Sequence, residues 1–279
     1  MSPHSTVHSG VVRKHSFTAS ASNSVPPPAA RAGTDIDHGV IAAAIRDTKG
    51  AFARIAWRHG GAWRTADWRG AALVMYAGAS RTADDGIVVL ITGALGGSGF
   101  SVFAVRGEWR DSVVWSNPVV VDRLEGSFSL PSLARLGGDS LVAVWHRNAN
   151  GGKPGRMMTA VTADGGRHWT LTPPSVSESA MDSQELAVDT AGVLHMVYRA
   201  AKHDNMLNER GFIMHAVWRS AVWSTPQVIS ARESDTGPMI GSAPAGRLMA
   251  MWTEAIHADP RAPMPKSVAS LWTPGCVSK

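Results

Sequence analysis

The chain has 279 residues, of which 44% are hydrophobic and 18% charged, a composition typical of a globular protein that can bury a sizeable core. Its single cysteine, Cys276, excludes a disulfide framework. The net charge of +5 favours anionic ligands. The basic residues are scattered and form no basic helix, so nucleic acid is not expected as a partner.

The N-terminal region predicts no targeting segment. The tail 1–25 is rich in Ser, His, Pro and Ala and contains no apolar run that would serve as a signal peptide. No stretch of the chain approaches the length of a membrane span, so no membrane partner is expected. We therefore expect a cytoplasmic protein, or a secreted one if a leader precedes this sequence.

One pattern, a small turn followed by an apolar strand, recurs five times: HGVIAAAI, DGIVVLIT, DSLVAVWH, GVLHMVYR and GRLMAMWT. The equivalent positions in these five segments are Val40, Ile87, Leu141, Leu194 and Leu248. A second marker keeps the same interval and consists of Trp63, Trp115, Trp169 and Trp223. Both series have a nearly constant spacing of roughly 50 residues, which indicates an internal repeat.

Each period holds about four short β-type runs separated by Gly, Asp, Asn and Pro turns, which is the content of one propeller blade. Residues 41–47 (IAAAIRD) are the best helix candidate, but their register with the other repeats favours a strand. We predict an all-β fold, a β-propeller of about five four-stranded blades, with six blades as the alternative count. A β-sandwich also alternates strands and turns, but it does not predict a constant interval between equivalent strands.

The last repeat is cut short. Trp272 matches Trp218 one repeat earlier, and the sequence ends at Lys279, too soon for an outer strand. An open sheet edge would invite aggregation. We predict that an N-terminal strand closes the last blade, with the alternating run at 6–12 as the candidate. The predicted organisation is an N-terminal tail, 1–25, and a single propeller domain, 26–279.

Residues 162–169 read TADGGRHW and match the pattern Ser/Thr-x-Asp-x-Gly-x-x-Trp. Such Asp and Thr side chains bond the backbone amides of a tight turn, and Gly supplies a positive φ. Within a fivefold β repeat, this motif resembles the sialidase-like propellers, which carry Asp boxes (BNR repeats), over roughly residues 27–279. The resemblance implies that the box joins the third and fourth strands of a blade, opposite the active site, and that Asp164 is structural.

The chain departs from true sialidases in two respects. It lacks their Arg-Ile-Pro tripeptide, and only Tyr76 and Tyr198 are present to match that family's tyrosine nucleophile. Tyr198 is the candidate catalytic residue of the two. The resemblance therefore implies the fold, and it does not imply cleavage of sialic acid.

Basic side chains collect on the loops opposite the Asp box, which are longest in repeats three to five, where sites are usually built. Arg46, Arg147 and Arg199 each lie at the end of the second strand of their repeat. Three guanidiniums there could hold a carboxylate by bidentate bonds, and the alternative is that they are solvated charges on the rim. His146 is a further candidate ligand-binding residue.

A glycosidase needs two facing carboxyl groups, one as acid and one as base or nucleophile. Asp182 and Glu254 are the predicted pair, and His203 and His257 are further acid–base candidates. No close His–His spacing supports a metal, so neither metal nor cofactor is predicted. The other acidic residues of these loops are Asp122, Glu125, Glu178, Glu185, Glu233 and Asp235.

Three functions fit these features, because a fold alone does not fix function. The leading hypothesis is a sialidase-like propeller acting on a small anionic glycan or glycoside at the funnel mouth, as a glycoside hydrolase. The first alternative is an intracellular small-molecule enzyme, such as a lyase, isomerase or cyclase. The second is a non-catalytic carbohydrate- or protein-binding propeller. Loops that differ between repeats favour one central site over five equivalent ones.

Overall fold

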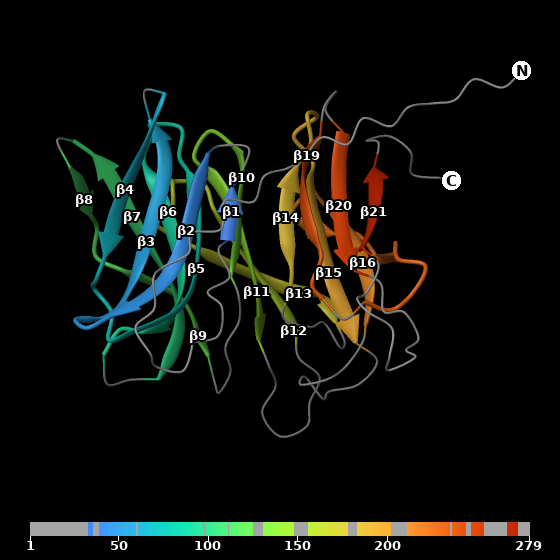
Figure 1. The fold of residues 1–279 in the computed structure, drawn as a ribbon, viewed down its shortest axis with the longest axis horizontal. Coiled ribbons are helices and arrows are strands. Elements are labelled where there is room, and N and C mark those ends of the chain that lie inside the picture. The colour runs from blue at the N-terminus through green and yellow to red at the C-terminus, as the bar shows by residue number, and fades with distance from the viewer. Residues whose placement is uncertain are drawn as a thin grey trace, which may run out of the picture.

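The computed structural model describes residues 33–35, 39–59, 61–96, 99–110, 112–124, 131–147, 156–177, 183–201, 211–234, 236–243, 247–253 and 267–272. These residues form five antiparallel sheets and no helix. Within these ranges, accordingly, no helix has the length and apolar character to cross a membrane. Figure 1 shows the first and second sheets at one end of the long axis, the fourth and fifth at the other, and the third between them.

The strands follow chain order within every sheet. The first sheet is β1 (Gly33–Asp35), β2 (Val40–Asp47), β3 (Gly50–His59) and β4 (Ala62–Trp68). The second is β5 (Leu73–Arg81), β6 (Ile87–Ala94), β7 (Phe100–Trp109) and β8 (Val113–Trp115), with β9 (Val119–Leu124) also on β7. The third is β10 (Ser132–Gly137), β11 (Ser140–Arg147), β12 (Arg156–Thr162) and β13 (Thr170–Ser177).

The fourth sheet is β14 (Glu185–Val188), β15 (Leu194–Ala201), β16 (Gly211–Arg219) and β17 (Val222–Trp223), with β18 (Gln227–Val228) also on β16. The fifth is β19 (Met239–Ala243), β20 (Arg247–Thr253) and β21 (Ser267–Trp272). A fourth strand for this sheet, predicted from the N-terminal tail, would come from residues outside the described ranges.

The repeat predicted from the sequence coincides with these sheets. The five marker residues Val40, Ile87, Leu141, Leu194 and Leu248 each lie at the start of a second strand and are at most 2% exposed. Residues 41–47 are a strand, and the matched Trp218 and Trp272 sit opposite Leu194 and Leu248 in the neighbouring strands. The all-β prediction is confirmed, and the fold is a β-propeller.

Strand direction divides the molecule into two ends. The turns from first to second strand and from third to fourth strand share one end, which we call the turn face. The second strand of each sheet ends, and the first or inner strand begins, at the opposite end, which we call the loop face. In Figure 1 the arrows of β15 and β20 point down toward the loop face.

The apolar core lies between neighbouring sheets. In the fourth and fifth sheets, the second strand presents Leu194 or Leu248 to the preceding sheet, and Leu141 of the third sheet packs likewise on Val88 and Leu90 of the second. In the second sheet, the equivalent face of β6, which carries Ile87, packs on the first sheet.

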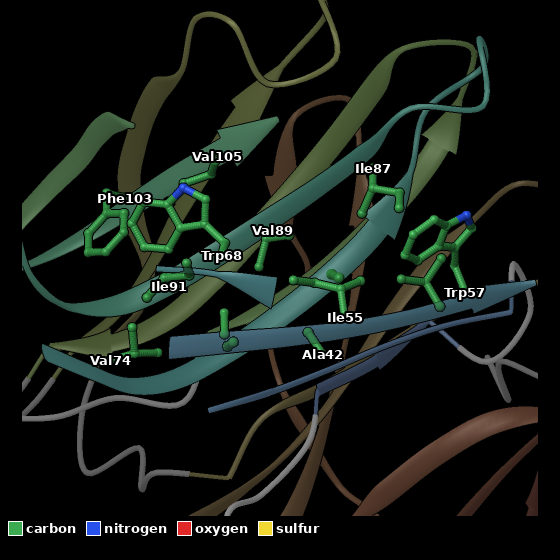
Figure 2. Close-up of a cluster of buried hydrophobic side chains, with 14 residues drawn as sticks. Ala42, Ile55, Trp57, Trp68, Val74, Ile87, Val89, Ile91, Phe103 and Val105 are labelled. Atoms are coloured by element: carbon green, nitrogen blue, oxygen red, sulfur yellow. The ribbon is translucent and has the colours of Figure 1, made fainter. Parts of the chain in front are cut away.

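The first sheet is turned over relative to this pattern. Val40 and Ala42 lie in one buried cluster with Ile87 and Val89, so equivalent residues of the first two sheets face each other. Figure 2 shows Ala42, Ile87 and Val89 of this cluster. Side-chain alternation in β3 explains the reversal, because one face of β3 is buried with Ile55 while the other carries exposed arginines such as Arg54. Packing that second face against another sheet would bury charge at a large cost.

The turn at 162–169 joins β12 to β13 and has the hydrogen bonds that its residue types predict. The Thr162 hydroxyl donates to Asp164 Oδ1 over 2.7 Å, and the same oxygen accepts the amides of Arg167 and His168 at 3.0 Å. Gly165 and Gly166 have φ of 67° and 86°, values that favour glycine. Burial raises the pKa of Asp164, but the bonds from His168, Thr162 and Arg167 outweigh it and hold this pKa well below its usual value.

A buried arginine ties this turn to the second sheet. Arg106 of β7 donates to Gly165 O over 3.1 Å and forms an ion pair with Asp84, and its side chain is 4% exposed. The Asp139 backbone oxygen accepts the Gly165 amide at 2.9 Å, and its carboxylate accepts the amide of Ala83 at 3.0 Å. The turn face is thus a network of hydrogen bonds that joins successive sheets.

We expect the substitution Asp164→Ala to lower the free energy of unfolding by about 1–3 kcal/mol, because it removes the acceptor for two turn amides and a hydroxyl. Urea unfolding measures the loss. His168→Ala is the matched control, since it removes one exposed partner of Asp164 and leaves the turn amides bonded. Equal stability of wild type and Asp164→Ala would contradict a structural role for this carboxylate.

Candidate functional site

The three predicted arginines do not share one interface. Arg46 is exposed near the end of β2. Arg147 lies on the face of β11 that meets the second sheet, and Arg199 lies on the face of β15 that also presents Val197 to the fifth sheet. All three belong to the loop face, but Arg147 and Arg199 point to opposite sides of their sheets.

Arg147 is held by a buried carboxylate. Its Nε donates to Asp122 Oδ2 over 3.1 Å, and a second nitrogen of the guanidinium pairs with Oδ1. The Trp145 indole N–H donates to the same Oδ2, also over 3.1 Å. The Asp122 side chain is 5% exposed and that of Arg147 is 39% exposed, so the ion pair is buried on the acidic side and open on the basic side.

His146 and Tyr198, two of the predicted site residues, lie at the same interface. Alternation places His146 on the face of β11 that carries Val142 and Val144, and these valines form one cluster with Tyr198 of β15. Both side chains are therefore at the loop-face end of the contact between the third and fourth sheets, each 2% exposed. Burial raises the pKa of Tyr198, so its hydroxyl stays protonated at neutral pH.

A buried glutamine that the sequence reasoning missed lies beside this interface. Gln184 is 1% exposed and donates to Val144 O over 3.3 Å, while its own backbone oxygen accepts the hydroxyl of Ser132 at 2.8 Å. It is the residue before β14, where the inner strand of the fourth sheet begins at the loop face. No motif marks it, because its polar contacts come from distant parts of the sequence.

Asp182, Glu254, His203 and His257 lie outside the described residues, but the chain neighbours of the two acids do not. Gly237 approaches Ser183 so closely that a side chain at position 237 would collide with it. The residue before Gly237, Thr236, bonds through its hydroxyl with that of Thr253, the last residue of β20. A chain of direct contacts therefore joins the residue after Asp182 to the residue before Glu254.

Two tryptophans at equivalent positions of β11 and β20 differ in their hydrogen bonding. Trp145 donates to Asp122, which lies seven residues after Trp115. The residue equivalent to Asp122 two repeats later is Ser230, which lies seven positions after Trp223. Its hydroxyl oxygen accepts the Ile213 amide at 3.0 Å instead. The buried indole N–H of Trp252 has no hydrogen-bond partner within the described part of the chain. Such a donor normally has a partner, often water or a ligand.

The described residues hold no cluster of three or more His, Cys, Asp or Glu side chains arranged for a metal ion. What they offer chemically is a set of buried neutral and cationic groups at the loop face. Such groups donate hydrogen bonds and orient a polar ligand, and they would complement carboxyl groups that carry out proton transfer.

No protein-family model matches the chain, and no curated protein does either. Several solved structures do. The α-L-arabinanase of Penicillium chrysogenum, solved with arabinobiose, is 11% identical with a TM-score of 0.57, over 76% of this chain and 71% of its own. A protein of unknown function from Dyadobacter fermentans is 12% identical with a TM-score of 0.56, over 86% and 76%.

An ulvan lyase, solved with a GlcA–Rha3S saccharide, is 11% identical with a TM-score of 0.52, over 85% of this chain and 64% of its own. Identities this low establish the fold alone. The chain is a β-propeller, a fold that it shares with enzymes that cleave polysaccharides.

Proposed function

We propose that the protein is a carbohydrate-active enzyme that cleaves a small anionic glycan at the loop face. One observation supports the proposal most strongly: buried polar and titratable side chains gather at the loop-face ends of β11, β14 and β15. Asp182 shortly precedes the start of β14, and Glu254 directly follows the end of β20 at the same face. In the middle of the sheets the same strands bury apolar residues. The Asp-box-like turn at 162–169, on the opposite face, agrees with this assignment.

In the proposed hydrolysis, Asp182 and Glu254 divide the roles of acid and base or nucleophile on either side of the glycosidic bond. The protonated Tyr198 hydroxyl and His146 orient the sugar, with His203 and His257 as further groups for proton transfer. Arg199 binds the anionic substituent, and Arg46 and the open side of Arg147, which belong to other interfaces of the loop face, contact other parts of the glycan. Asp122 holds Arg147 in place by two bonds and so fixes the direction of its remaining donors.

A lyase is the second candidate, favoured by the buried pair His146 and Tyr198. Elimination from a uronate needs a cation on the carboxylate, a base that takes the proton beside it, and an acid for the leaving oxygen. Arg199 supplies the cation, and His146 and Tyr198 supply the base and the acid. This reaction does not require Asp182 or Glu254.

The test is an assay of the purified chain on two substrates, arabino-oligosaccharides and GlcA–Rha3S oligosaccharides. Hydrolysis releases reducing sugar without ultraviolet absorbance, whereas elimination produces an unsaturated, absorbing product. We expect cleavage of the anionic substrate, by hydrolysis. Absence of both turnover and calorimetric binding on both substrates would contradict the proposal.

Trp252 is assigned as a donor to the ligand in the same proposal, because its N–H lacks a protein acceptor among the described residues and Glu254 follows two residues later. We expect Trp252→Phe to raise KM by about 5- to 50-fold, the worth of one hydrogen bond to a buried or charged acceptor. The melting temperature should stay unchanged or rise. Trp145→Phe is the matched control, and it should lower the melting temperature because it strips the buried Asp122 of a donor.

A further inference from the structure

Two histidines and an aspartate form a hydrogen-bonded chain inside the fourth sheet. The Nε2 atom of His195 lies 3.3 Å from Asp189 Oδ2, and its Nδ1 lies 3.2 Å from His215 Nε2. The two imidazole rings are stacked, with centroids 5.4 Å apart and planes within 9°. The side chains of Asp189 and His195 are 4% and 12% exposed, and His215 is 7% exposed.

This chain faces the fifth sheet. In β15 and β16, every second side chain packs against the third sheet, and His195 and His215 lie between those positions. They therefore share the opposite face of the two strands with Val197 and Ile213. Those two residues pack on Leu248 and other apolar side chains of the fifth sheet. The surroundings thus offer little solvation to a charged imidazole.

The positions of the protons follow from the acceptors. The Asp189 carboxylate also accepts the amides of Ala191 and Val193, at 2.9 Å and 2.8 Å, and can only accept from His195 Nε2. Neutral His195 then presents Nδ1 as an acceptor, so His215 Nε2 carries the proton between the rings. A further proton on His195 Nδ1 would place two donors face to face at 3.2 Å unless His215 moved its own proton from Nε2 to Nδ1.

Among the described residues, the charges that act on the two imidazoles leave a second proton unfavourable. Burial lowers the pKa of His195, Asp189 opposes this and Arg219 adds to it. Burial, followed by the charge of His195, lowers the pKa of His215 to about 3. On the other strands in contact, Glu185 of β14 shares the face of Ala187 but lies opposite Val197, nearer the loop face than His195. Gln227 of β18 is neutral, Leu248 is apolar, and Arg247 precedes Leu248 and so belongs to the opposite face of β20.

We propose that this histidine pair makes the contact between the fourth and fifth sheets acid-labile, so that this contact opens before the rest of the propeller as the pH falls. Both histidines bind protons more weakly when folded than when unfolded. Their contribution is complete above pH of about 6.5, the unfolded value, and is lost progressively as the pH falls toward about 3.

The first test compares urea unfolding of wild type and His215→Gln between pH 7.5 and pH 4.5. The glutamine amide can still donate to His195 but does not titrate. In wild type, the equilibrium constant for unfolding should rise by up to about tenfold for each unit by which the pH falls, for each histidine that is protonated only on unfolding. In His215→Gln, the unfolding equilibrium constant should rise less than in wild type, by a factor of up to about ten for each pH unit, because one titrating histidine is absent. His168→Gln, at a position whose side chain is 90% exposed, is the control and should keep the wild-type slope.

The second test needs no variant. Hydrogen-exchange protection factors of wild type at pH 7 and pH 5 should fall most in β15, β16 and β20, and least in β3, β6 and β7. An NMR titration should show His215 remaining neutral at pH 5. Parallel stability curves for wild type and His215→Gln, uniform loss of protection, or titration of His215 near pH 6.5 would each overturn the proposal.

Discussion

Glu254→Gln and Asp182→Asn are each expected to lower kcat by about 10²- to 10⁴-fold, the contribution of a positioned acid or base to a proton transfer. Each amide keeps the size of the carboxyl group but can neither give nor take a proton at neutral pH. The folded protein should survive both changes, with a melting temperature within a few degrees of wild type. Initial rates on the cleaved oligosaccharide and thermal unfolding measure the two quantities.

Glu233→Gln is the matched control, because Glu233 belongs to a connection between sheets at the same loop face. It should retain wild-type kcat. Full activity of both Glu254→Gln and Asp182→Asn would exclude these acids. If the product were unsaturated in that case, the lyase chemistry of His146 and Tyr198 would replace the hydrolytic one.

Asp122→Ala is expected to destabilise the protein by about 3–5 kcal/mol, the cost of breaking a buried ion pair. The change leaves the buried indole N–H of Trp145 without its acceptor and releases both bonds of the Arg147 guanidinium. Partial exposure of Arg147 limits the loss, because its charge can be solvated, so the lower end of this range is expected. Urea unfolding at neutral pH measures the change.

Asp122→Asn separates the two parts of this effect. The amide oxygen can still accept from Trp145 or Arg147. Asp122→Asn should therefore destabilise the protein by roughly half as much as Asp122→Ala does. If Asp122→Ala were as stable as wild type, the ion pair would not hold Arg147. The proposed orientation of its free donors toward a ligand would then fail as well.

The strands were predictable from the sequence because the same order of apolar runs and turns recurs at a nearly constant interval. The marker leucines at 141, 194 and 248 are buried at the same strand position for that reason. The turn at 162–169 was also predictable, since the hydrogen bonds of its Thr162 and Asp164 side chains join residues at most four positions apart. Local chemistry suffices in both cases.

The reversed packing of the first sheet could not be predicted from the repeat alone. Its signal was present in β3, where Arg54 and Arg58 alternate with buried residues, but spacing between repeats carries no information on which face is polar. The binding of Arg147 by Asp122 and the burial of Gln184 depend on contacts between residues 25 and 40 positions apart. Neither follows from a motif or from strand alternation.

A crystal structure with a bound GlcA–Rha3S oligosaccharide would show directly whether ligands bind at the loop face. We expect the saccharide at the ends of β11, β15 and β20, with Arg199, Tyr198 or Trp252 within hydrogen-bond distance of its oxygens. A saccharide bound instead at the turn face, beside Arg106 and Asp164, would contradict ligand binding at the loop face and invert the assignment of the two faces.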